Sequence, residues 1–299
     1  MNSIATVQHE PLPGYIVTER IGSGGYGEVF KAVAPGGIEK AVKSLYGYHD
    51  EELASRELKA LERIKQLRHP FLLSLDRFEV VDGRLVVVTE LADGSLDDRF
   101  QEHRRQGRPG IPRDELLGYL RDAADALDYM QQQHGLQHLD VKPENLLVVG
   151  GHVKVADFGL VKDVARASQK SMMGGMTPTY AARELFDNSP GARSDQYSLA
   201  IVYQEMLTGT LPFPGRTAAQ LVAQHTQATP RLASLPEQDQ AAIGRALAKN
   251  PDDRYSSCME MVDALVAGGV APREPAEREA SAPWSPPSDA GDDTKGASS

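Results

Sequence analysis

Polar and apolar residues alternate along much of the first third of the chain, which is the pattern of strands with one buried face. Turn residues separate the alternating segments, among them Pro35-Gly36-Gly37 and Asp82-Gly83. The expected strands comprise residues 15–21, 28–33, 39–45, 71–81 and 84–91. Residues 50–67 instead begin with acidic residues, which a helix N-terminus favours. Their apolar residues then recur at helical spacing. The pattern predicts a small antiparallel sheet with one helix.

After Asp93-Gly94 the apolar residues recur every three or four positions, which is typical of helices. The expected helices comprise residues 114–135, 194–209, 218–226 and 239–250. Beyond Val270, Pro, Ala, Ser and acidic residues dominate, a composition that cannot bury a core. We therefore expect a flexible N-terminal arm, a domain of two lobes and a disordered tail. Their expected bounds are 1–11 for the arm, 12–92 and 93–267 for the lobes of the domain 12–267, and 268–299 for the tail.

Composition narrows the class of protein. The single cysteine, Cys258, excludes an intramolecular disulfide and a cysteine-cluster metal site. No apolar run approaches the roughly 20 residues that span a bilayer, and the first residues lack the basic and apolar regions of a secretory signal. The net charge of −10 disfavours nucleic acid and anionic membranes as partners. We expect a cytoplasmic protein, and the sequence sets no oligomeric state.

A glycine-rich segment, IGSGGYGEV, runs from Ile21 to Val29 and contains Gly22, Gly24 and Gly27 in a G-x-G-x-x-G pattern. In a dinucleotide-binding fold a helix follows such glycines, whereas here the next residues alternate like a strand. The alternative is a β-hairpin whose backbone N–H groups fold over phosphates. Taken alone, the pattern also fits a flexible hairpin turn without a ligand.

Sixteen residues after Gly27, Lys43 lies inside an apolar strand, where its charge needs a partner. A lysine at a sheet edge could instead reach water. The partner should be an acid on the inner face of the following helix. Glu57 has leucines four residues before and after it, whereas Glu62 lies nearer the polar side. Glu57 is the preferred partner and Glu62 the alternative.

Asp140, Lys142 and Asn145 precede the apolar strand LLVV, and a second strand ends in Asp157-Phe158-Gly159. An antiparallel pair of these strands would bring Asn145 and Asp157 together. Their oxygens suit Mg²⁺, which keeps phosphate oxygens among its ligands. Asp140 could accept a hydroxyl proton, and Lys142 could meet the charge of a transferring phosphoryl group. A turn rich in Asp and Asn is the simpler alternative.

These motifs occur together and in order, and the sequence thereby resembles the eukaryotic-type (Hanks-type) protein kinases. The resemblance covers about residues 12–267. The motif DVKPEN makes it closer to the Ser/Thr branch of the family than to the Tyr branch. Its motifs are IGSGGYGEV, AVK, RHPFL, TEL, HLDVKPEN, DFG, TPTYAARE, SDQYSLA and PDDRY. The resemblance implies an α+β, bilobal fold, with an N-terminal antiparallel sheet carrying one helix and a mainly α-helical C-terminal lobe. It also implies ATP with Mg²⁺, or alternatively Mn²⁺, and protein substrates with Ser or Thr acceptors.

The resemblance implies a role for each matching residue. Asp140, Lys142, Lys43 and Glu57 would be catalytic, and Asn145 and Asp157 would hold the metal. The residues expected around the nucleotide are Ile21, Gly22, Gly24, Gly27, Val29, Ala41, Lys43, Thr89, Glu90, Ala92 and Leu147. Four residues would stack between the lobes: Leu61, Leu75, His138 and Phe158. The supporting contacts would be Asp195 with the catalytic-loop backbone, Glu184 with Arg254, and Thr177 with Asp140 and Lys142.

The sequence departs from the family at three places: Leu139 replaces the Arg before the catalytic Asp, Ala182-Arg183-Glu184 replaces A-P-E, and Tyr197 replaces Trp. We interpret the last two as packing variants. The missing Arg would pair with a phosphorylated activation-loop residue, so its loss removes a switch but no ligand of ATP, metal or acceptor. We therefore expect a kinase that is active without activation-loop phosphorylation, with Ser168 and Ser171 modified as output.

Two alternative functions remain open at this point. A pseudokinase scaffold would bind nucleotide or a protein partner without transfer, and a small-molecule kinase would use the same fold. The complete set of catalytic groups favours transfer, and the Thr177-Pro178 segment favours a protein acceptor. Glu144 either favours basic residues upstream of the acceptor or is an ordinary surface carboxylate.

Overall fold

The structure is a computed structural model that describes residues 10–24, 27–46, 51–157 and 177–269. For residues 24, 51–57, 60 and 269 this description covers the backbone alone. The chain divides into two units, residues 1–269 and 270–299, and the second unit lies outside the described residues.

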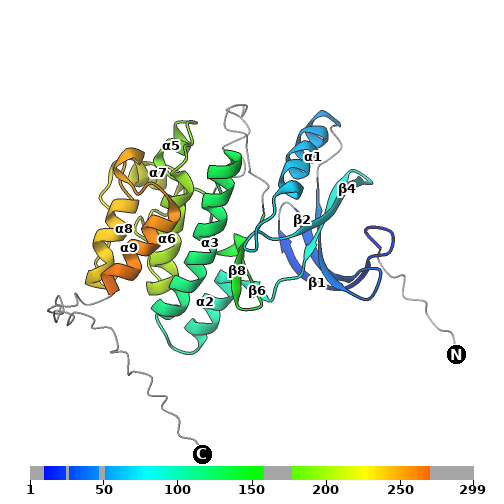
Figure 1. The fold of residues 1–299 in the computed structure, drawn as a ribbon, viewed down its shortest axis with the longest axis horizontal. Helices are drawn as coiled ribbons and strands as arrows, with labels where there is room; N and C mark the ends of the chain where they lie inside the picture. Colours follow the sequence, from blue (N-terminus) through cyan, green and yellow to red (C-terminus); the bar gives the residue numbers. More distant parts are fainter. Residues whose placement is uncertain (1–9, 25–26, 47–50, 158–176, 270–299) are drawn as a thin grey trace, which may run out of the picture. The chain divides into compact units, whose positions relative to one another are not determined.

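A five-stranded antiparallel sheet forms the N-terminal lobe, with strand order β1-β2-β3-β5-β4 (Figure 1). The strands are β1 (Ile16–Gly24), β2 (Gly27–Val33), β3 (Glu39–Leu45), β4 (Leu75–Val81) and β5 (Arg84–Glu90). Helix α1 (Glu51–Gln66) packs against β4. One sheet face carries a small core of Ala32, Val42, Val86 and Val88, closed by Leu12. This lobe confirms the predicted sheet with one helix.

The fourth strand begins later than the sequence predicts. Residues 71–74 lie outside β4, and Phe71 and Leu73 hydrogen-bond instead to the backbone of Val155. A parallel bridge joins Leu72 to the same residue. The apolar run from 71 to 81 therefore serves two sheets, since its first residues find their backbone partners in the C-terminal lobe.

A second sheet contains β6 (Gly94–Ser95), β7 (Leu146–Val149) and β8 (His152–Val155), all antiparallel and in that order. Gly150 and Gly151 join β7 to β8 and both have positive φ, which glycine adopts without strain. The predicted strand pair is thus present, and its open end brings residue 145 next to residue 156: the Ala156 N–H donates to the Asn145 carbonyl at 2.9 Å.

The remaining lobe is helical, as predicted. Its helices are α2 (Leu96–Arg105), α3 (Arg113–His134), α5 (Arg183–Phe186), α6 (Ser194–Thr208), α7 (Ala218–Gln227), α8 (Glu237–Ala246) and α9 (Cys258–Gly269), with 3-10 turns at Pro143–Asn145 and Pro251–Asp253. Helices α3, α6, α8 and α9 pack on one another (Figure 1). Nearly every side chain of α6 is buried, so this helix runs through the centre of the lobe. Helices α2 and α9 were not among the predicted elements.

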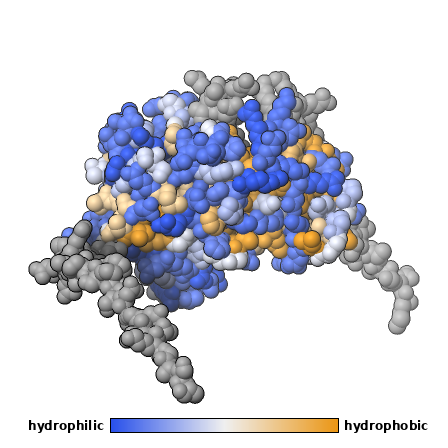
Figure 2. All heavy atoms as spheres, viewed as in Figure 1, coloured by the Kyte–Doolittle hydropathy of each residue, from blue (hydrophilic) through white to orange (hydrophobic). Residues whose placement is uncertain are grey.

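Figure 2 shows a mostly hydrophilic surface, with hydrophobic residues gathered toward the strand-rich half in this view. Among the described residues, the large hydrophobic side chains left exposed include Ile21, Ile38, Tyr46 and Val80, all on or beside strands of the N-terminal lobe. Within the described ranges no helix has the length and apolar character needed to cross a membrane.

Candidate active site

One face of the N-terminal sheet carries the residues expected around a nucleotide. The strand register pairs Gly22 with Val29, Val29 with Lys43, and Ala41 with Thr89. Residues directly opposite each other in a sheet share a face, so these five side-chain positions line one surface. The small core described above occupies the opposite face of the same strands. The structure therefore groups the predicted residues, with Ile21 exposed at the margin.

The glycines of the glycine-rich segment differ in how closely other atoms approach them. A Cβ on Gly27 would lie 2.2 Å from the Ser44 carbonyl oxygen and 3.0 Å from the Leu45 Cα. A Cβ on Gly22 would meet the Val29 side chain at 3.5 Å, which is ordinary contact. Gly27 is therefore required by the close approach of β2 to β3, whereas none of the described residues requires glycine at position 22. Gly24 lies at the end of β1, and its surroundings are outside the described residues.

Lys43 reaches across to the second sheet, where its Nζ lies 2.6 Å from Asp157 Oδ2. Burial would raise the pKa of the Asp157 carboxyl, but the charges of Lys43 and Lys142 hold that pKa below its usual value. The Glu57 side chain lies outside the described residues, so its pairing with Lys43 stays a prediction. Glu62 is exposed, as expected for the polar side of α1.

A buried carboxylate, Asp195, holds the backbone of the loop of residues 138–145. The N–H groups of His138 and Leu139 donate to Asp195 Oδ2 and Oδ1, both at 2.8 Å. Leu139 has a φ of 63°, a left-handed conformation that is strained for a leucine. Its side chain is only 6% exposed and belongs to the main core. The core and the Asp195 bonds together keep this loop in a conformation it would not adopt alone.

His138 links this loop to Ala156, which lies between the end of β8 and Asp157. Its Nε2 lies 2.8 Å from the Ala156 carbonyl oxygen, and the Asp140 N–H donates to its Nδ1 at 3.3 Å. Because Nδ1 accepts and a carbonyl can only accept, the ring is neutral with its hydrogen on Nε2. The imidazole thus fixes the spacing between Asp140 and the residue before Asp157.

Asp140 sits at the centre of a polar cluster. Its Oδ1 accepts from Thr177 Oγ1 at 3.0 Å, and its Oδ2 accepts from Asn145 Nδ2 at 3.0 Å. Lys142 Nζ lies 2.7 Å from Asp140 Oδ2 and donates to Thr177 Oγ1 at 3.2 Å. The structure therefore brings together the groups that the sequence placed in one loop. Thr177, 35 residues after Lys142, contacts both Asp140 and Lys142, as the resemblance implied.

Asn145 and Asp157 stand at adjoining ends of β7 and β8, as the strand pairing predicts. An amide oxygen and a carboxylate are hard oxygen donors of the kind that Mg²⁺ prefers. In the described part of the chain, no group of three or more His, Cys, Asp and Glu side chains could hold a metal ion. A metal here would therefore need phosphate or water oxygens as further ligands, and the donor set fits that arrangement.

The segment between the lobes contains the predicted residues Thr89, Glu90 and Ala92. Thr89 Oγ1 donates to the Glu90 carbonyl at 3.1 Å. The Glu90 carboxylate accepts from Lys154 Nζ, 2.8 Å from both oxygens, and from the Ser74 N–H at 2.8 Å. Lys154 belongs to β8 and Ser74 precedes β4. Glu90 therefore connects the segment between the lobes to both sheets. Leu147 lies on β7 opposite Lys154.

Lys154 and Ser74 were not predicted as site residues from the sequence. The available signal was Lys154 itself, a charged residue inside the apolar strand HVKVA, which resembles the Lys43 situation. Its partner could not be read from the sequence, because Glu90 lies 64 residues away.

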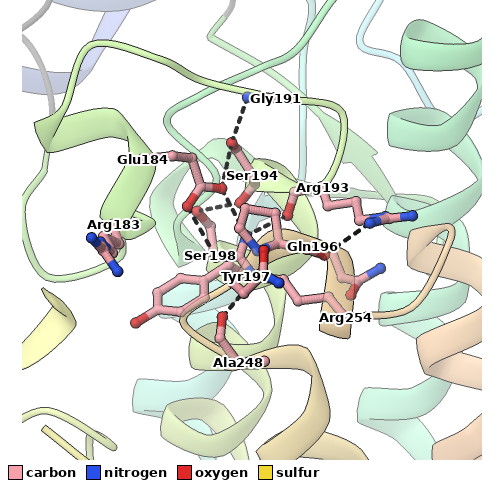
Figure 3. A network of polar contacts seen from close by, with 12 residues as sticks. Arg183, Glu184, Gly191, Arg193, Ser194, Gln196, Tyr197, Ser198, Ala248 and Arg254 are labelled. Carbon is pink, nitrogen blue, oxygen red and sulfur yellow. Dashed lines mark hydrogen bonds and ion pairs between the residues drawn. The ribbon is translucent and has the colours of Figure 1, made fainter. Parts of the chain in front are cut away.

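A buried ion pair supports the segment of residues 177–184. Arg254 NH1 and NH2 donate to Glu184 Oε1 and Oε2 at 2.7 and 2.9 Å, and Ser194 Oγ donates to Oε1 at 2.8 Å (Figure 3). Arg254 is only 1% exposed and also donates to the carbonyls of Arg193 and Ala248. Burial would raise the pKa of Glu184, but Arg254 holds it below its usual value. Figure 3 shows Arg183 pointing away from this network.

Tyr180 fixes the middle of segment 177–184. Its hydroxyl donates to Glu205 Oε2 at 2.7 Å, and its carbonyl accepts from Ser198 Oγ at 2.8 Å. Burial, with the charges of Glu144 and Asp97, raises the pKa of Glu205.

Several expected residues fall outside this description. Phe158, Ser168 and Ser171 lie outside the described residues. Of the stack expected with Phe158, Leu61 and Leu75 are partly buried against the main core and His138 is fully buried.

The chain is similar to known protein kinases over most of its length. The family model described as "Protein kinase domain" matches residues 15–266. The chain is 31% identical to the serine/threonine-protein kinase PknF of Mycobacterium tuberculosis, over 84% of this chain and 56% of that protein. It is 31% identical to human serine/threonine-protein kinase ULK3, over 70% of this chain and 45% of that protein. The chain thus spans about half the length of these relatives. The crystal structure of the M. tuberculosis PknI kinase domain superposes with a TM-score of 0.68 at 29% identity, covering 89% of this chain and all of that one.

Proposed function

Since this chain belongs to the protein kinase domain family, we propose that it is a serine/threonine protein kinase that transfers the γ-phosphoryl group of ATP to Ser or Thr hydroxyls of proteins. The observation that carries the proposal is the convergence of Lys43, Asp140, Lys142, Asn145 and Asp157 at the junction of the two sheets and the catalytic loop. Phosphoryl transfer needs mainly such positioning and charge.

In this proposal the acceptor hydroxyl lies against Asp140, which orients it and accepts its proton. The hydroxyl oxygen forms a bond to the γ-phosphorus, while the bond from that phosphorus to the bridging oxygen breaks and releases ADP. Lys142, 2.7 Å from Asp140, meets the negative charge that develops on the transferred group. Thr177 keeps Asp140 and Lys142 in register through its hydroxyl.

The nucleotide would lie under the sheet face that carries Val29, Ala41, Lys43 and Thr89, with Lys43 on its phosphates. Backbone groups of Glu90 and Ala92 would hold the adenine, and Leu147 would cover its other side. Asn145 and Asp157 would hold Mg²⁺, or Mn²⁺ as an alternative, which supplies positive charge to the phosphate oxygens. Glu57 would pair with Lys43 once nucleotide binds.

Transfer is tested with the purified chain, Mg²⁺, γ-labelled ATP and myelin basic protein as acceptor, followed by phosphoamino-acid analysis. We expect label on Ser or Thr, and a loss of at least about 100-fold in Lys43→Met and Asp140→Asn. Lys40→Met is the matched control, because Lys40 lies on the same strand but pairs with Asp76 at 2.5 Å. Nucleotide binding without any labelling would favour the scaffold alternative, and labelling that survives Asp140→Asn would refute the mechanism.

We further propose that the kinase works without phosphorylation of the segment 158–176. The supporting observation is Leu139, whose buried apolar side chain offers no cation to a phosphate beside Asp140. Ser168 and Ser171 are the only hydroxyl residues between 158 and 176. Phosphatase-treated protein and the double variant Ser168→Ala/Ser171→Ala should keep most of their activity toward myelin basic protein. Loss of most activity in either sample would reject this regulation.

A cytoplasmic location and an interaction with protein substrates, not with nucleic acid or membrane, complete the proposal. It is supported by the acidic net charge of −10. Fractionation of cells that produce the chain, with detection in the soluble or membrane fraction, tests the location.

A further inference from the structure

The carboxylate of Glu90, the last residue of β5, points away from the sheet face that carries the expected nucleotide contacts. Thr89 lies opposite Ala41 on that face, and successive residues of a strand point to opposite faces. The Glu90 side chain is only 21% exposed. Both of its oxygens lie 2.8 Å from Lys154 Nζ, and Oε1 also accepts from the Ser74 N–H at 2.8 Å. This carboxylate is therefore bound by the protein and does not face the nucleotide.

The two partners of this carboxylate belong to segments that are bonded to each other. The Leu73 N–H donates to the Val155 carbonyl at 2.9 Å, and the Val155 N–H donates to the Phe71 carbonyl at 2.8 Å. Ser74 directly follows Leu73 in the chain. Lys154 directly precedes Val155. Backbone hydrogen bonds therefore keep the two partners next to each other, independently of the carboxylate that they bind.

The main-chain groups of Glu90 have separate partners. Its N–H donates to the Ser74 carbonyl at 3.2 Å, which leaves its carbonyl as the main-chain group that can meet a nucleotide. That carbonyl accepts from Thr89 Oγ1 at 3.1 Å, and a carbonyl oxygen has a second lone pair. A group that binds this second lone pair must be a donor. The exocyclic amino group of adenine is such a donor, whereas guanine has a carbonyl oxygen at the corresponding position.

We propose that Lys154 is a positioning residue for the nucleotide: with Ser74 it holds Glu90 so that the Glu90 carbonyl accepts from the exocyclic amino group of adenine. Because Lys154 lies on β8 and Ser74 lies just before β4, the carbonyl is fixed relative to both sheets. Lys154 acts through Glu90, so its effect depends on that amino group. The inference rests on the proposed function, since it takes ATP to occupy the sheet face opposite the carboxylate.

Two nucleotides that differ only in the amino group isolate this effect. ADP carries the group and purine riboside diphosphate lacks it, so the Kd of the analogue divided by the Kd of ADP reports the amino contact. Both Kd values are measured with Mg²⁺ by isothermal titration calorimetry, which needs no phosphoryl transfer. Lys154→Met should reduce the ratio by roughly fivefold, the factor that corresponds to a hydrogen bond of about 1 kcal/mol. Lys154→Arg, which can donate two bonds to the carboxylate, should restore most of the ratio.

Lys40→Met is the matched control. Lys40 lies directly opposite Glu90 on β3 and is as buried as Lys154, at 21% and 20% exposed, but its Nζ pairs with Asp76. The ratio should not change in this variant. Glu90→Gln is the second test, for the case that Lys154→Met does not fold. It keeps an acceptor for the Ser74 N–H but loses the charge that binds Lys154, so the ratio should fall by a smaller factor.

The outcomes separate this inference from the proposed function. An unchanged ratio in Lys154→Met or, where that variant is unfolded, in Glu90→Gln overturns the positioning role. Equal weakening of both nucleotides is such a result, since it indicates a general loss of structure, and tighter binding of ADP overturns the role as well. If the original chain binds ADP but never labels an acceptor, the proposed function fails alone. If it binds no ADP, both fail.

Discussion

The ion pair between Glu184 and Arg254 allows a quantitative test of what holds the C-terminal lobe together. Glu184→Ala leaves the Arg254 guanidinium without its carboxylate while it remains almost fully buried. Breaking a buried pair from one side costs about 3–5 kcal/mol, because the remaining charge is neither paired nor hydrated. The carbonyls of Arg193 and Ala248 still accept from Arg254, so we expect the lower end of that range.

For a chain of this size about 1 kcal/mol corresponds to roughly 2–4 °C in Tm. Glu184→Ala should therefore lower Tm by roughly 6–12 °C, measured by differential scanning calorimetry. The double variant Glu184→Leu/Arg254→Met removes both charges and should be much less destabilised than the sum of its single variants, since an apolar replacement costs little.

Arg183→Ala is the control for this experiment, because Arg183 neighbours Glu184 but is exposed and lies 3.8 Å from Asp187. We expect a change within about 0.5 kcal/mol. The reasoning is refuted if Glu184→Ala is as mild as Arg183→Ala, or if the two single-variant losses simply add in the double variant.

Three further predictions concern the sheet, the pH dependence and the catalytic loop. Gly27→Ala should destabilise the chain by about 1–3 kcal/mol, because its Cβ would overlap the Ser44 carbonyl, whereas Gly22→Ala should leave Tm nearly unchanged; equal melting of the two variants would contradict this assignment. The pKa of His225 falls from 6.5 to about 4 on folding, so the unfolded chain binds the extra proton between those values. Urea unfolding should therefore show about 3 kcal/mol of stability lost from this group as pH falls from 6.5 to 4, and His225→Phe should abolish that share of the slope. Asp195→Asn replaces one of the two carboxylate oxygens that accept from the catalytic-loop backbone. The factor by which kcat falls should therefore be larger than the factor by which the KM for ATP changes. A normal kcat would show that the loop holds its strained conformation without Asp195.

The sequence predicted those parts of the fold whose signals are local. The alternation of strands β1 to β3, the Asp82-Gly83 turn and the acidic start of α1 each lie within a few residues, and the structure confirms the elements they indicate. Helix α2 was missed although Ser95 and Asp98 form a capping box at its start, because its charged sequence lacks an apolar stripe. Residues 71–74 were assigned to β4 because local alternation cannot reveal that their partner is Val155.

In the candidate site, too, the sequence predicted the residues with local signals and missed contacts between distant residues. Asp140, Lys142 and Asn145 lie within six positions, so one loop sufficed to group them, and the hairpin between β7 and β8 added Asp157. Pairs across long separations could be named only through the family resemblance. Glu90 with Lys154 and Tyr197 with His225 are pairs that the resemblance did not supply, and they were missed because each residue alone is an ordinary polar group in an apolar segment.

Helix α6 gives the molecule a particular kind of cooperativity. Its first turns carry Asp195 under the catalytic loop, Ser194 and Tyr197 beside the ion pair, and Ser198 under segment 177–184. A helix enclosed on all sides cannot open by fraying at a surface, so its amides should exchange only when the whole lobe unfolds. On gradual heating, therefore, the chemistry and the lobe are expected to fail at one common midpoint, with no temperature at which a folded but disassembled site persists.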